Sequence, residues 1–410
     1  MLVSNLFTKT KKQDPADEQF VNAKLLTRAG FIYKNIAGVY SYLPLGFLVL
    51  QNIRRVIREE LDAIGAEEVY LNELQDKATW EASGRWDELK DIMYQFKDLR
   101  GKELGLATTH EEVVTKIAKE YINSYKDMPK GIFQIQDKFR NEPRARSGLL
   151  RGREFEMKDL YSFHPDNECL DRYYQMVAGA YRKIFTRLGI DAIYTTASGG
   201  SFSQEHSHEF QAITENGEDT IYYCVKCQIA KNKEIVGGAE VDASEIEARC
   251  DGCGGKLELK RSIEVGNIFK LGTKFSKAQN LLFKDKDGKE QLVTMASYGI
   301  GTGRALATIA EINSDKNGLV WNTETAPYKA YVINLAKEKL EIPENMDRKV
   351  LIDDRDDVSA GEKFADADLL GIPYRVVKSA KTGEKFEIKD RKNGKIELMT
   401  GQEFAKKIDM

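Results

Sequence analysis

The sequence predicts an α+β fold in which helices flank an antiparallel sheet. It also predicts a small metal-binding ribbon inserted in that sheet and a short α/β domain at the C-terminal end. Three observations support this prediction: a period-two pattern between residues 132 and 161, apolar positions at helical spacing on both sides of it, and two Cys-x-x-Cys pairs separated by 22 residues. At 410 residues the chain is too long for one compact core, so we expect two or three domains.

The composition excludes several classes of protein. Hydrophobic residues make up 41% of the chain, which is enough for packed cores and argues against a largely disordered protein. Lys and Arg number 62 against 65 Asp and Glu, so any contact with RNA must be local rather than driven by a general basic field. No apolar run approaches the roughly 20 residues of a membrane span, and the N-terminal residues do not resemble a signal peptide. We therefore expect a cytoplasmic protein without a membrane partner.

The first well-marked element is a helix over residues 49–64. Its apolar residues recur at helical spacing, and Gly65 supplies a C-terminal stop. The strand-like sequence EEVYL follows at residues 67–71. The segment is predicted to be a helix followed by a strand.

Two strands are predicted between residues 132 and 161. In the first, Phe133 and Ile135 alternate with glutamines, and in the second, Phe155 and Met157 alternate with charged residues. The segment EPRARSG between them reads as a loop. The strands are therefore expected to form an antiparallel pair.

Two further helices are predicted, one from about Asp166 to Leu188 and one beginning near Gly303. Composition changes place the domain boundaries on either side of a cysteine-bearing segment and again near residue 326. We expect a discontinuous main domain of residues 1–214 and 264–325, a ribbon of residues 215–263 and a C-terminal domain of residues 326–410.

The segment FRNEPRARSGLLRGREFEMKD at residues 139–159 is the richest in chemistry. On strands, Arg140 and Glu142 would share one face, as would Arg151 and Phe155, so a guanidinium and an aromatic ring would point into one cleft. This pattern suits a nucleotide, because arginine binds phosphate and an aromatic ring stacks on a base. The alternative is a hairpin covered by surface salt bridges.

The order FRxE, loop, LRxREF resembles motif 2 of the class II aminoacyl-tRNA synthetases, and SYGIGTGRALATIAE resembles their motif 3. The helix and strand at 49–75 occupy the place of motif 1, although Asn72 replaces its proline. Within the class, the chain is most similar to the bacterial type of prolyl-tRNA synthetase. The similar stretches include LLTRAGFIYKNIAGVYSYLPLG, SGRWDEL, THEEVVT, FQIQDKFRNE, REFEMKDLYSFH, SHEFQ, EVGNIFKLGTKFS, SYGIG and FADADLLGIP.

The resemblance implies an ATP site. Arg140 would contact the α-phosphate, Glu142 the adenine edge and Phe155 the adenine face, while Arg151 and Arg304 would bind the outer phosphates. Arg140 and Arg304 would be the catalytic residues. No protein nucleophile is required, because the carboxylate of proline attacks the α-phosphate directly with Mg²⁺ and the arginines stabilising charge.

The resemblance also implies an amino-acid site and a tRNA contact. The residues implied for proline are Thr109, Glu111, Arg140, His208 and Asn267, the last of which replaces the usual histidine. The spacing of His206 and His208 can also mimic a metal site, but we favour a structural role near the pocket. Arg144 and Arg146 lie in the motif 2 loop, which meets the tRNA acceptor end in the family, or they are simply solvated arginines.

Four of the five cysteines predict a structural zinc site. Cys224, Cys227, Cys250 and Cys253 have the spacing of a four-thiolate ribbon. The alternative is four reduced cysteines without a metal. Most bacterial-type relatives hold a much larger editing insertion here, which about 45 residues cannot contain. We therefore expect no editing of mischarged tRNA by this chain.

The resulting hypothesis is an enzyme, a homodimer that uses ATP, Mg²⁺ and zinc to attach proline to tRNA(Pro) through prolyl-adenylate. The alternatives are a synthetase-like paralogue that binds tRNA or a partner without catalysis, and an enzyme for another small amino acid, raised by Asn267. In the C-terminal domain, the stretch between YVINL and KVLIDDR is short and contains Pro343. A helix there is expected to be shortened or lost, which would weaken anticodon binding.

Overall fold

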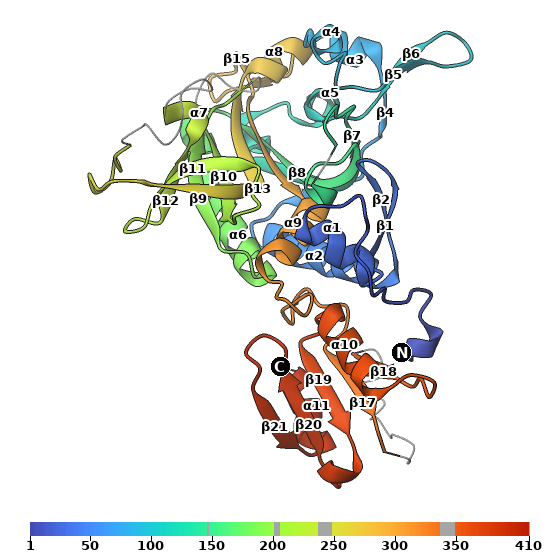
Figure 1. Ribbon diagram of the computed structural model, residues 1–410. Coiled ribbons are helices and arrows are strands. Elements are labelled where there is room, and N and C mark those ends of the chain that lie inside the picture. Colours follow the sequence, from blue (N-terminus) through green and yellow to red (C-terminus); the bar gives the residue numbers. More distant parts are fainter. Residues whose placement is uncertain (146, 201–205, 237–247, 337–348, 410) are drawn as a thin grey trace.

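The computed structural model describes residues 1–145, 147–200, 206–236, 248–336 and 349–409 (Figure 1). Within these ranges a nine-stranded, mostly antiparallel sheet forms the centre of the larger part of the molecule. In spatial order its strands are β10 (Ser207–Ile213), β9 (Ala192–Ala197), β12 (Ile229–Asn232), β11 (Asp219–Cys224), β13 (Glu258–Gly272), β16 (Thr294–Gly301), β8 (Glu154–His164), β7 (Lys130–Phe139) and β3 (Glu67–Glu68). The predicted α+β class with an antiparallel sheet is confirmed.

Helices cover one face of this sheet and form the main core with it. They are α1 (Val21–Arg28), α2 (Pro44–Asp62), α6 (Asn167–Leu188) and α9 (Thr302–Ile312). The apolar side of α2, including Val49, Ile53 and Ile57, is fully buried against them. On the opposite face a second apolar core packs at one end of the sheet, around Tyr161, Phe163 and Met295, and the rest of that face is open to a binding site.

The predicted helices are confirmed, but one of them begins earlier in the sequence than expected. The helix expected from residue 49 begins at Pro44, because proline fits the first turn, where its missing N–H has no helical partner. In α6 the Asp166 carboxylate accepts the backbone N–H of Cys169, and Gly189 ends the helix with φ 76°. The strand expected at 67–71 is shorter, with only Glu67 and Glu68 in β3.

The strands predicted between 132 and 161 are confirmed as β7 and β8, which pair antiparallel. Their burial differs from expectation, since Gln134, Gln136 and Lys138 are buried whereas Ile135 and Phe155 are only partly buried. Arg140 and Arg151 lie just beyond the strand ends. The polar alternation thus marks buried positions of the sheet rather than a solvated face.

The cysteine-bearing hairpin β11–β12 is part of the sheet. Strand β11 pairs with β13 and β12 pairs in parallel with β9. Strand β13 continues from Glu258 to Gly272 and pairs β11, β10 and β16 in turn, so it crosses the expected boundary at 263 without interruption.

Smaller elements surround this sheet. An N-terminal hairpin consists of β1 (Ile32–Ile36) and β2 (Val39–Tyr42). The others are β4 (Leu74–Asp76), α3 (Lys77–Glu81), α4 (Arg85–Glu88), β5 (Gln95–Lys97), β6 (Glu103–Leu106), α5 (Glu111–Tyr121), α7 (Lys233–Val236), α8 (Lys274–Gln279), β14 (Leu282–Lys284) and β15 (Glu290–Leu292), with short 3₁₀ turns at Val3–Asn5, Tyr125–Asp127 and Gly148–Leu150.

The C-terminal domain lies below the main sheet in Figure 1. Its sheet has the order β18 (Val350–Asp353), β17 (Ala330–Asn334), β19 (Tyr374–Lys378), β20 (Phe386–Asp390) and β21 (Ile396–Met399), accompanied by α10 (Ala360–Leu370), α11 (Gly401–Asp409) and a 3₁₀ turn at Ala380–Thr382. The first three strands are parallel and the last two antiparallel. The stretch around Pro343, where a shortened helix was predicted, lies outside the described residues.

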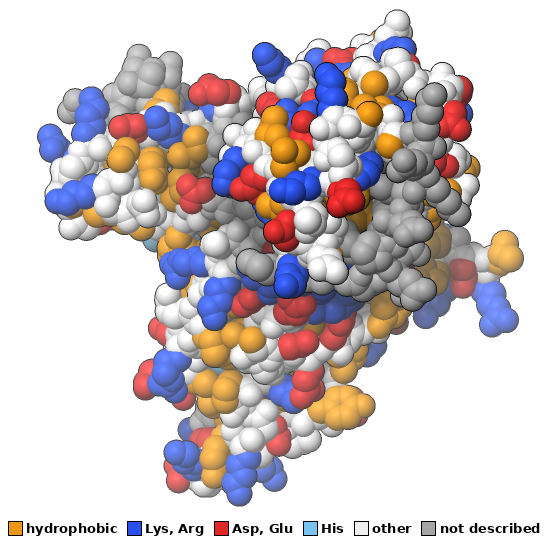
Figure 2. Space-filling model, turned by 90° about the horizontal axis from the view of Figure 1, so that it is seen from below, with side chains coloured by type: hydrophobic (Ala, Val, Ile, Leu, Met, Phe, Trp, Pro, Cys, Tyr) orange, Lys and Arg blue, Asp and Glu red, His pale blue; other side chains and the backbone are white. Residues whose placement is uncertain are grey.

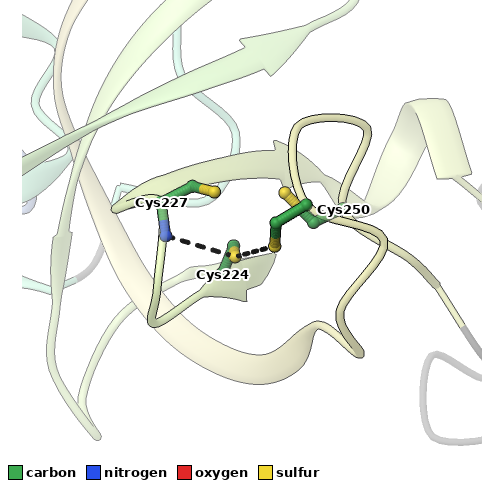
Figure 3. Close-up of side chains that lie close together, drawn as sticks. Cys224, Cys227 and Cys250 are labelled. Carbon is green, nitrogen blue, oxygen red and sulfur yellow. Dashed lines mark hydrogen bonds between the residues drawn. The ribbon is translucent and has the colours of Figure 1, made fainter.

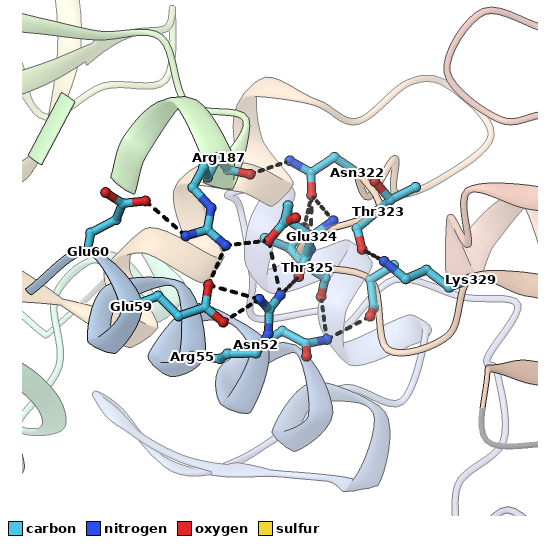
Figure 4. A network of polar contacts seen from close by, with 11 residues as sticks. Asn52, Arg55, Glu59, Glu60, Arg187, Asn322, Thr323, Glu324, Thr325 and Lys329 are labelled. Atoms are coloured by element: carbon cyan, nitrogen blue, oxygen red, sulfur yellow. Dashed lines mark hydrogen bonds and ion pairs between the residues drawn. The ribbon is translucent and has the colours of Figure 1, made fainter. Parts of the chain in front are cut away.

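A polar network fixes the segment that connects the main sheet to the C-terminal domain (Figure 4). Arg187 at the end of α6 pairs with Glu59 of α2 at 2.5 Å and with Glu324 of the connecting segment at 3.0 Å. Arg55 of α2 contacts both carboxylates at 3.0 Å. The connecting segment is thus fixed to the helical layer.

On the face seen from below, basic and acidic side chains are interspersed (Figure 2). This agrees with the nearly balanced charge of the whole chain. Among the described residues, no helix has the length and apolar character needed to cross a membrane.

Candidate active site

A cavity of about 360 Å³ lies on the sheet face opposite the helices. Its lining includes six of the residues proposed from the sequence: Arg140, Glu142, Arg151, Phe155, Asn267 and Arg304. They come from the ends of β7 and β8, from β13 and from the first turn of α9. Segments more than 100 residues apart in sequence therefore meet at one site, as the nucleotide hypothesis requires.

Arg140 lies against the aromatic ring of Phe155, with its Cζ atom 5.2 Å from the ring centre. Its Nε and Nη2 atoms donate to the backbone oxygen of Thr108 at 3.4 and 3.3 Å. Burial lowers the pKa of Arg140, an effect that Asp159 and Glu111 oppose. A guanidinium held this way is a fixed positive charge for an anionic group.

Glu142 and Arg151 face each other across the β7–β8 connection, with Arg151 Nε 2.9 Å from a Glu142 oxygen. Burial alone would raise the pKa of Glu142, but hydrogen bonds from Arg151 and from the backbone N–H of Arg144 outweigh it and lower this pKa. Arg144 is in the exposed loop, and Arg146 lies outside the described residues. Glu142 is therefore an ionised acceptor at the cavity rim.

Arg304 projects from the first turn of α9, with Nη1 3.6 Å from Glu264. Its Nε atom is buried and has no hydrogen-bond partner within the described ranges. A buried donor without a partner is costly unless a ligand accepts from it. Together with Arg140, this atom makes the cavity suited to phosphate.

Gly299 keeps the cavity floor open. A Cβ atom at this position would lie 2.7 Å from Met157 Cε and 2.8 Å from Asn267 Oδ1, closer than such atoms pack. The Nδ2 atom of Asn267 donates to Glu264 at 2.9 Å. Asn267 thus lies in the cavity, as expected, but it is turned toward a carboxylate that the sequence did not identify.

Thr109 and Glu111 lie beside this cavity rather than on its wall, and the Thr109 hydroxyl donates to the Glu111 carboxylate at 2.5 Å. Both are buried, and Glu111 is also 3.6 Å from the buried guanidinium of Arg85. Since Arg140 bonds the neighbouring carbonyl of Thr108, the two sites are contiguous. The Arg85 contact was not predicted, although SGRWDEL was noted as a signature stretch.

His208 is placed differently from the other proposed residues. It is not part of the cavity wall, and its ring stacks on Tyr194 with centres 4.5 Å apart while Nδ1 lies 2.9 Å from the Tyr174 hydroxyl. Tyr174 belongs to α6, so the imidazole is on the helix-covered face. Burial lowers the pKa of His208 to about 4. This geometry agrees with a structural role and gives the ring no direct route to the cavity.

Sequence reasoning missed an acidic wall opposite the arginines. Glu264 and Asp219 line the cavity, and Glu209 lies behind them, where burial and the charge of Glu264 raise its pKa. A buried ion pair, Lys138 to Asp159 at 2.8 Å, lies on the same face. Glu209 is within the noted SHEFQ stretch, but its proximity to Glu264 arises only from the pairing of β10 with β13.

The four cysteines of the ribbon converge (Figure 3). Their sulfur atoms all lie within 4.8 Å of one another, and Cys224 Sγ is 3.6 Å from Cys253 Sγ. The backbone N–H of Cys227 donates to Cys224 Sγ at 3.4 Å. Four sulfurs at these separations fit a tetrahedral zinc ion.

The fold and the cavity define a class II aminoacyl-tRNA synthetase core. The tRNA synthetase class II core domain (G, H, P, S and T) matches residues 94–313, and the anticodon binding domain matches residues 329–409. Crystal structures of prolyl-tRNA synthetase from Cryptosporidium parvum, complexed with halofuginone and AMPPNP or with L-proline and AMP, share the fold. Their TM-scores are 0.75 and 0.73 at 16% identity, over 95% of this chain and 76% of those chains.

Relatives that match over nearly the whole chain identify the family within this class. A proline–tRNA ligase of Rickettsia bellii is 39% identical over 420 residues, covering 97% of this chain and 96% of its own. One from Sulfurimonas denitrificans is 38% identical over 91% of each chain, and one from Streptomyces coelicolor is 33% identical over 98% and 97%. The chain belongs to the proline–tRNA ligase family.

Proposed function

We propose that this enzyme joins proline to tRNA(Pro) in two steps, forming prolyl-adenylate from ATP and then transferring the prolyl group. The observation that supports this most strongly is the convergence of Arg140, Glu142, Arg151, Phe155 and Arg304 on one cavity in a member of this ligase family. No observation favours a non-catalytic paralogue or a different amino acid.

Each cavity residue has a role that follows from its position. Phe155 offers its ring to adenine, and Glu142 accepts from the adenine amino group. Arg140 neutralises the α-phosphate and the attacking carboxylate, because it is held between the cavity and the Thr108 carbonyl. Arg304 and Arg151 bind the outer phosphates and stabilise the departing pyrophosphate. The two catalytic residues in this proposal are Arg140 and Arg304.

We infer that proline binds beside Arg140, where Glu111 accepts from the protonated ring nitrogen. Thr109 orients that carboxylate through their 2.5 Å hydrogen bond, and the Arg85 guanidinium lies 3.6 Å from it. Asn267, which the resemblance also implies for proline, lines the cavity beside Gly299. His208 contributes through the packing of Tyr174 rather than by touching proline.

The acidic wall fits Mg²⁺, which prefers carboxylate oxygens near substrate phosphates. Glu264 and Asp219 are two of the carboxylates that line the cavity, and burial together with the charge of Glu264 raises the pKa of Glu209 behind them. When bound there, Mg²⁺ would neutralise charge on the triphosphate.

We infer that the four cysteines hold a structural zinc ion. The cluster is separated from the cavity by the length of β11, so a metal there has no access to the reacting atoms. Elemental analysis should give one zinc per chain, and a metal-free protein that folds and works normally would contradict this inference.

We also propose a homodimer, because the segment in the place of motif 1 pairs subunits in this family, although the apolar face of the 49–64 helix does not support it. The apolar side of α2 is buried within the chain and is not available to a second copy. Exposed apolar side chains nearby support the dimer instead, namely Phe47, Leu48, Tyr70 and Leu74, with Tyr70 84% exposed. A monomer in light scattering at micromolar concentration would contradict the proposal.

The chain is proposed to be a bacterial-type enzyme without an editing domain, acting in the cytoplasm. We assign residues 1–214 and 264–325 to catalysis, 215–263 to the ribbon and 326–410 to anticodon binding.

The alignment with the Streptomyces coelicolor relative spans 552 residues, whereas the alignment with the Rickettsia bellii relative spans 420. The Streptomyces coelicolor relative therefore has residues without a counterpart in this chain. Incubation with alanyl-tRNA(Pro) tests this directly, since hydrolysis above the spontaneous rate would show that the chain edits.

Aminoacylation of tRNA(Pro) with labelled proline tests the whole proposal. Charging should require ATP and Mg²⁺, and Arg144→Ala should slow it without slowing pyrophosphate exchange, because the motif 2 loop is proposed to meet the acceptor end. Failure to charge tRNA(Pro) under any of these conditions would contradict the proposed function.

A further inference from the structure

The hairpin β11–β12 joins the cysteine cluster to the wall of the nucleotide cavity. Strand β11 begins at Asp219, which lines the cavity, and ends at Cys224. Strand β12 begins two residues after Cys227 and ends at Asn232. A strand of six residues spans about 20 Å, so the thiols and the cavity lie at opposite ends of one paired element.

At the cavity end, the hairpin contacts a buried carboxylate. Asn232 Nδ2 donates to Glu209 Oε2 at 3.0 Å. Gln211 Nε2 donates to the same oxygen at 2.8 Å and to Asp219 Oδ2 at 3.2 Å. Because Glu209 also faces Glu264, each of these hydrogen bonds offsets the cost of keeping acidic groups together. Asn232 and Asp219 thus tie both hairpin strands to the acidic wall.

At the other end, within the part of the chain that the structure describes, the hairpin is held by the thiols, a small apolar cluster and the ion pair of Lys231 with Asp251 at 2.8 Å. The apolar cluster there consists of Tyr222, Ala248, Leu257 and Val236 with the cysteines themselves. Such a small cluster supplies little hydrophobic stabilisation, so a metal that crosslinks the four sulfurs would dominate its rigidity. Pairing of β11 with β13 and of β12 with β9 keeps the hairpin in the sheet in either case. Loss of the metal would therefore displace the hairpin rather than unfold the protein.

We propose that the metal bound by Cys224, Cys227, Cys250 and Cys253 positions the acidic wall of the nucleotide cavity, with Asn232 as the positioning residue that links them. Metal occupancy then sets the affinity for ATP with Mg²⁺. It leaves proline affinity unchanged, because Thr109 and Glu111 belong to a different segment, at the start of α5. This proposal rests on the proposed function, since it takes the cavity to be the ATP site.

The test compares three variants of the full-length protein: the double variant Cys224→Ser with Cys253→Ser, Asn232→Ala, and Lys226→Ala as a control. Lys226 is exposed in the same turn as the cysteines and is remote from Glu209. Zinc content, circular dichroism, the Kd for ATP at fixed Mg²⁺ and the KM for proline are measured for each.

Asn232→Ala should retain zinc and bind ATP about fivefold more weakly, which corresponds to about 1 kcal/mol, with the KM for proline unchanged. The double cysteine variant should lose zinc and show the same selective loss of ATP affinity, while Lys226→Ala should match the wild type. Should the double variant fail to fold, Asn232→Ala decides the matter alone.

Unchanged ATP affinity in Asn232→Ala would overturn the proposal, as would equal losses of ATP and proline affinity. A wild-type protein that does not bind ATP would overturn the proposed function itself, and that result is distinguishable because it appears without any substitution.

Discussion

The hydroxyl of Thr302 donates a 2.6 Å hydrogen bond to Oε1 of Glu156, the same carboxylate that Arg54 of α2 contacts through Nε at 2.9 Å. Glu156 points to the helix-covered side of β8, and Thr302 is the first residue of α9, two positions before Arg304. One buried carboxylate therefore connects α2, the central sheet and the helix that presents Arg304 to the cavity. This arrangement orients the first turn of α9.

Replacing Thr302 with Val should remove that connection while preserving the shape of the side chain. We expect a loss of about 1–3 kcal/mol in the free energy of unfolding, because the Glu156 carboxylate loses a buried donor. The KM for ATP should rise, since Arg304 loses its orientation. Thr302→Ser keeps the hydroxyl and should behave nearly as the wild type. Equal stability and equal KM in Val and Ser variants, measured by urea denaturation and initial rates, would contradict this account.

Arg140→Ala and Arg304→Ala should each reduce proline-dependent pyrophosphate exchange by about a hundredfold. Each substitution leaves transition-state charge on the phosphates uncompensated, which costs about 3 kcal/mol. Arg172 is an exposed arginine paired with Glu168 on α6, and Arg172→Ala is the matched control. If both cavity variants retained normal exchange rates, the assignment of the phosphate site would be wrong.

Glu111→Gln should affect proline more than ATP. Removal of the negative charge takes away the partner of the protonated ring nitrogen, so the KM for proline should rise about tenfold or more. The KM for ATP should change little. Glu120→Gln, an exposed position on the same helix, serves as control. Parallel increases in both KM values, obtained from exchange kinetics, would indicate that Glu111 supports the fold instead of the pocket.

Lowering the pH from about 7 toward 5 should reduce the stability of the folded protein. Burial lowers the pKa of His110, His164 and His208 to about 4, whereas in the unfolded chain each keeps the ordinary value of about 6.5. The unfolded state therefore binds more protons between these values, and stability is fully present above about pH 6.5 and is lost as the pH falls toward 4. Denaturation midpoints from about pH 7 down to pH 5 check this. A flat profile over that interval would exclude buried neutral histidines.

Much of the fold follows from local sequence signals. Regular spacing and caps located α6 and α9, and alternation located β7 and β8. The start of α2 was misjudged because its first residues mix apolar and small side chains, so only Pro44 marks the beginning.

The candidate site was predicted where residues are close in sequence or within a motif. Glu264, Glu209 and Asp219 were missed because their proximity depends on the pairing of β10, β11 and β13, which no short-range pattern encodes. His208 was expected nearer the pocket, but strand alternation directs its ring to Tyr174. The apolar face of α2 gives no support for a dimer, since an apolar helix face does not reveal whether its partner is another helix of the same chain.

The central claim is that this cavity activates proline with ATP. The most direct measurement is ATP–pyrophosphate exchange by the purified protein against each of the twenty amino acids in turn. We predict exchange that depends on proline, with weaker exchange for alanine because a pocket for proline cannot strongly exclude a smaller side chain. Exchange that is faster with another amino acid, or absent with all twenty, would contradict the account.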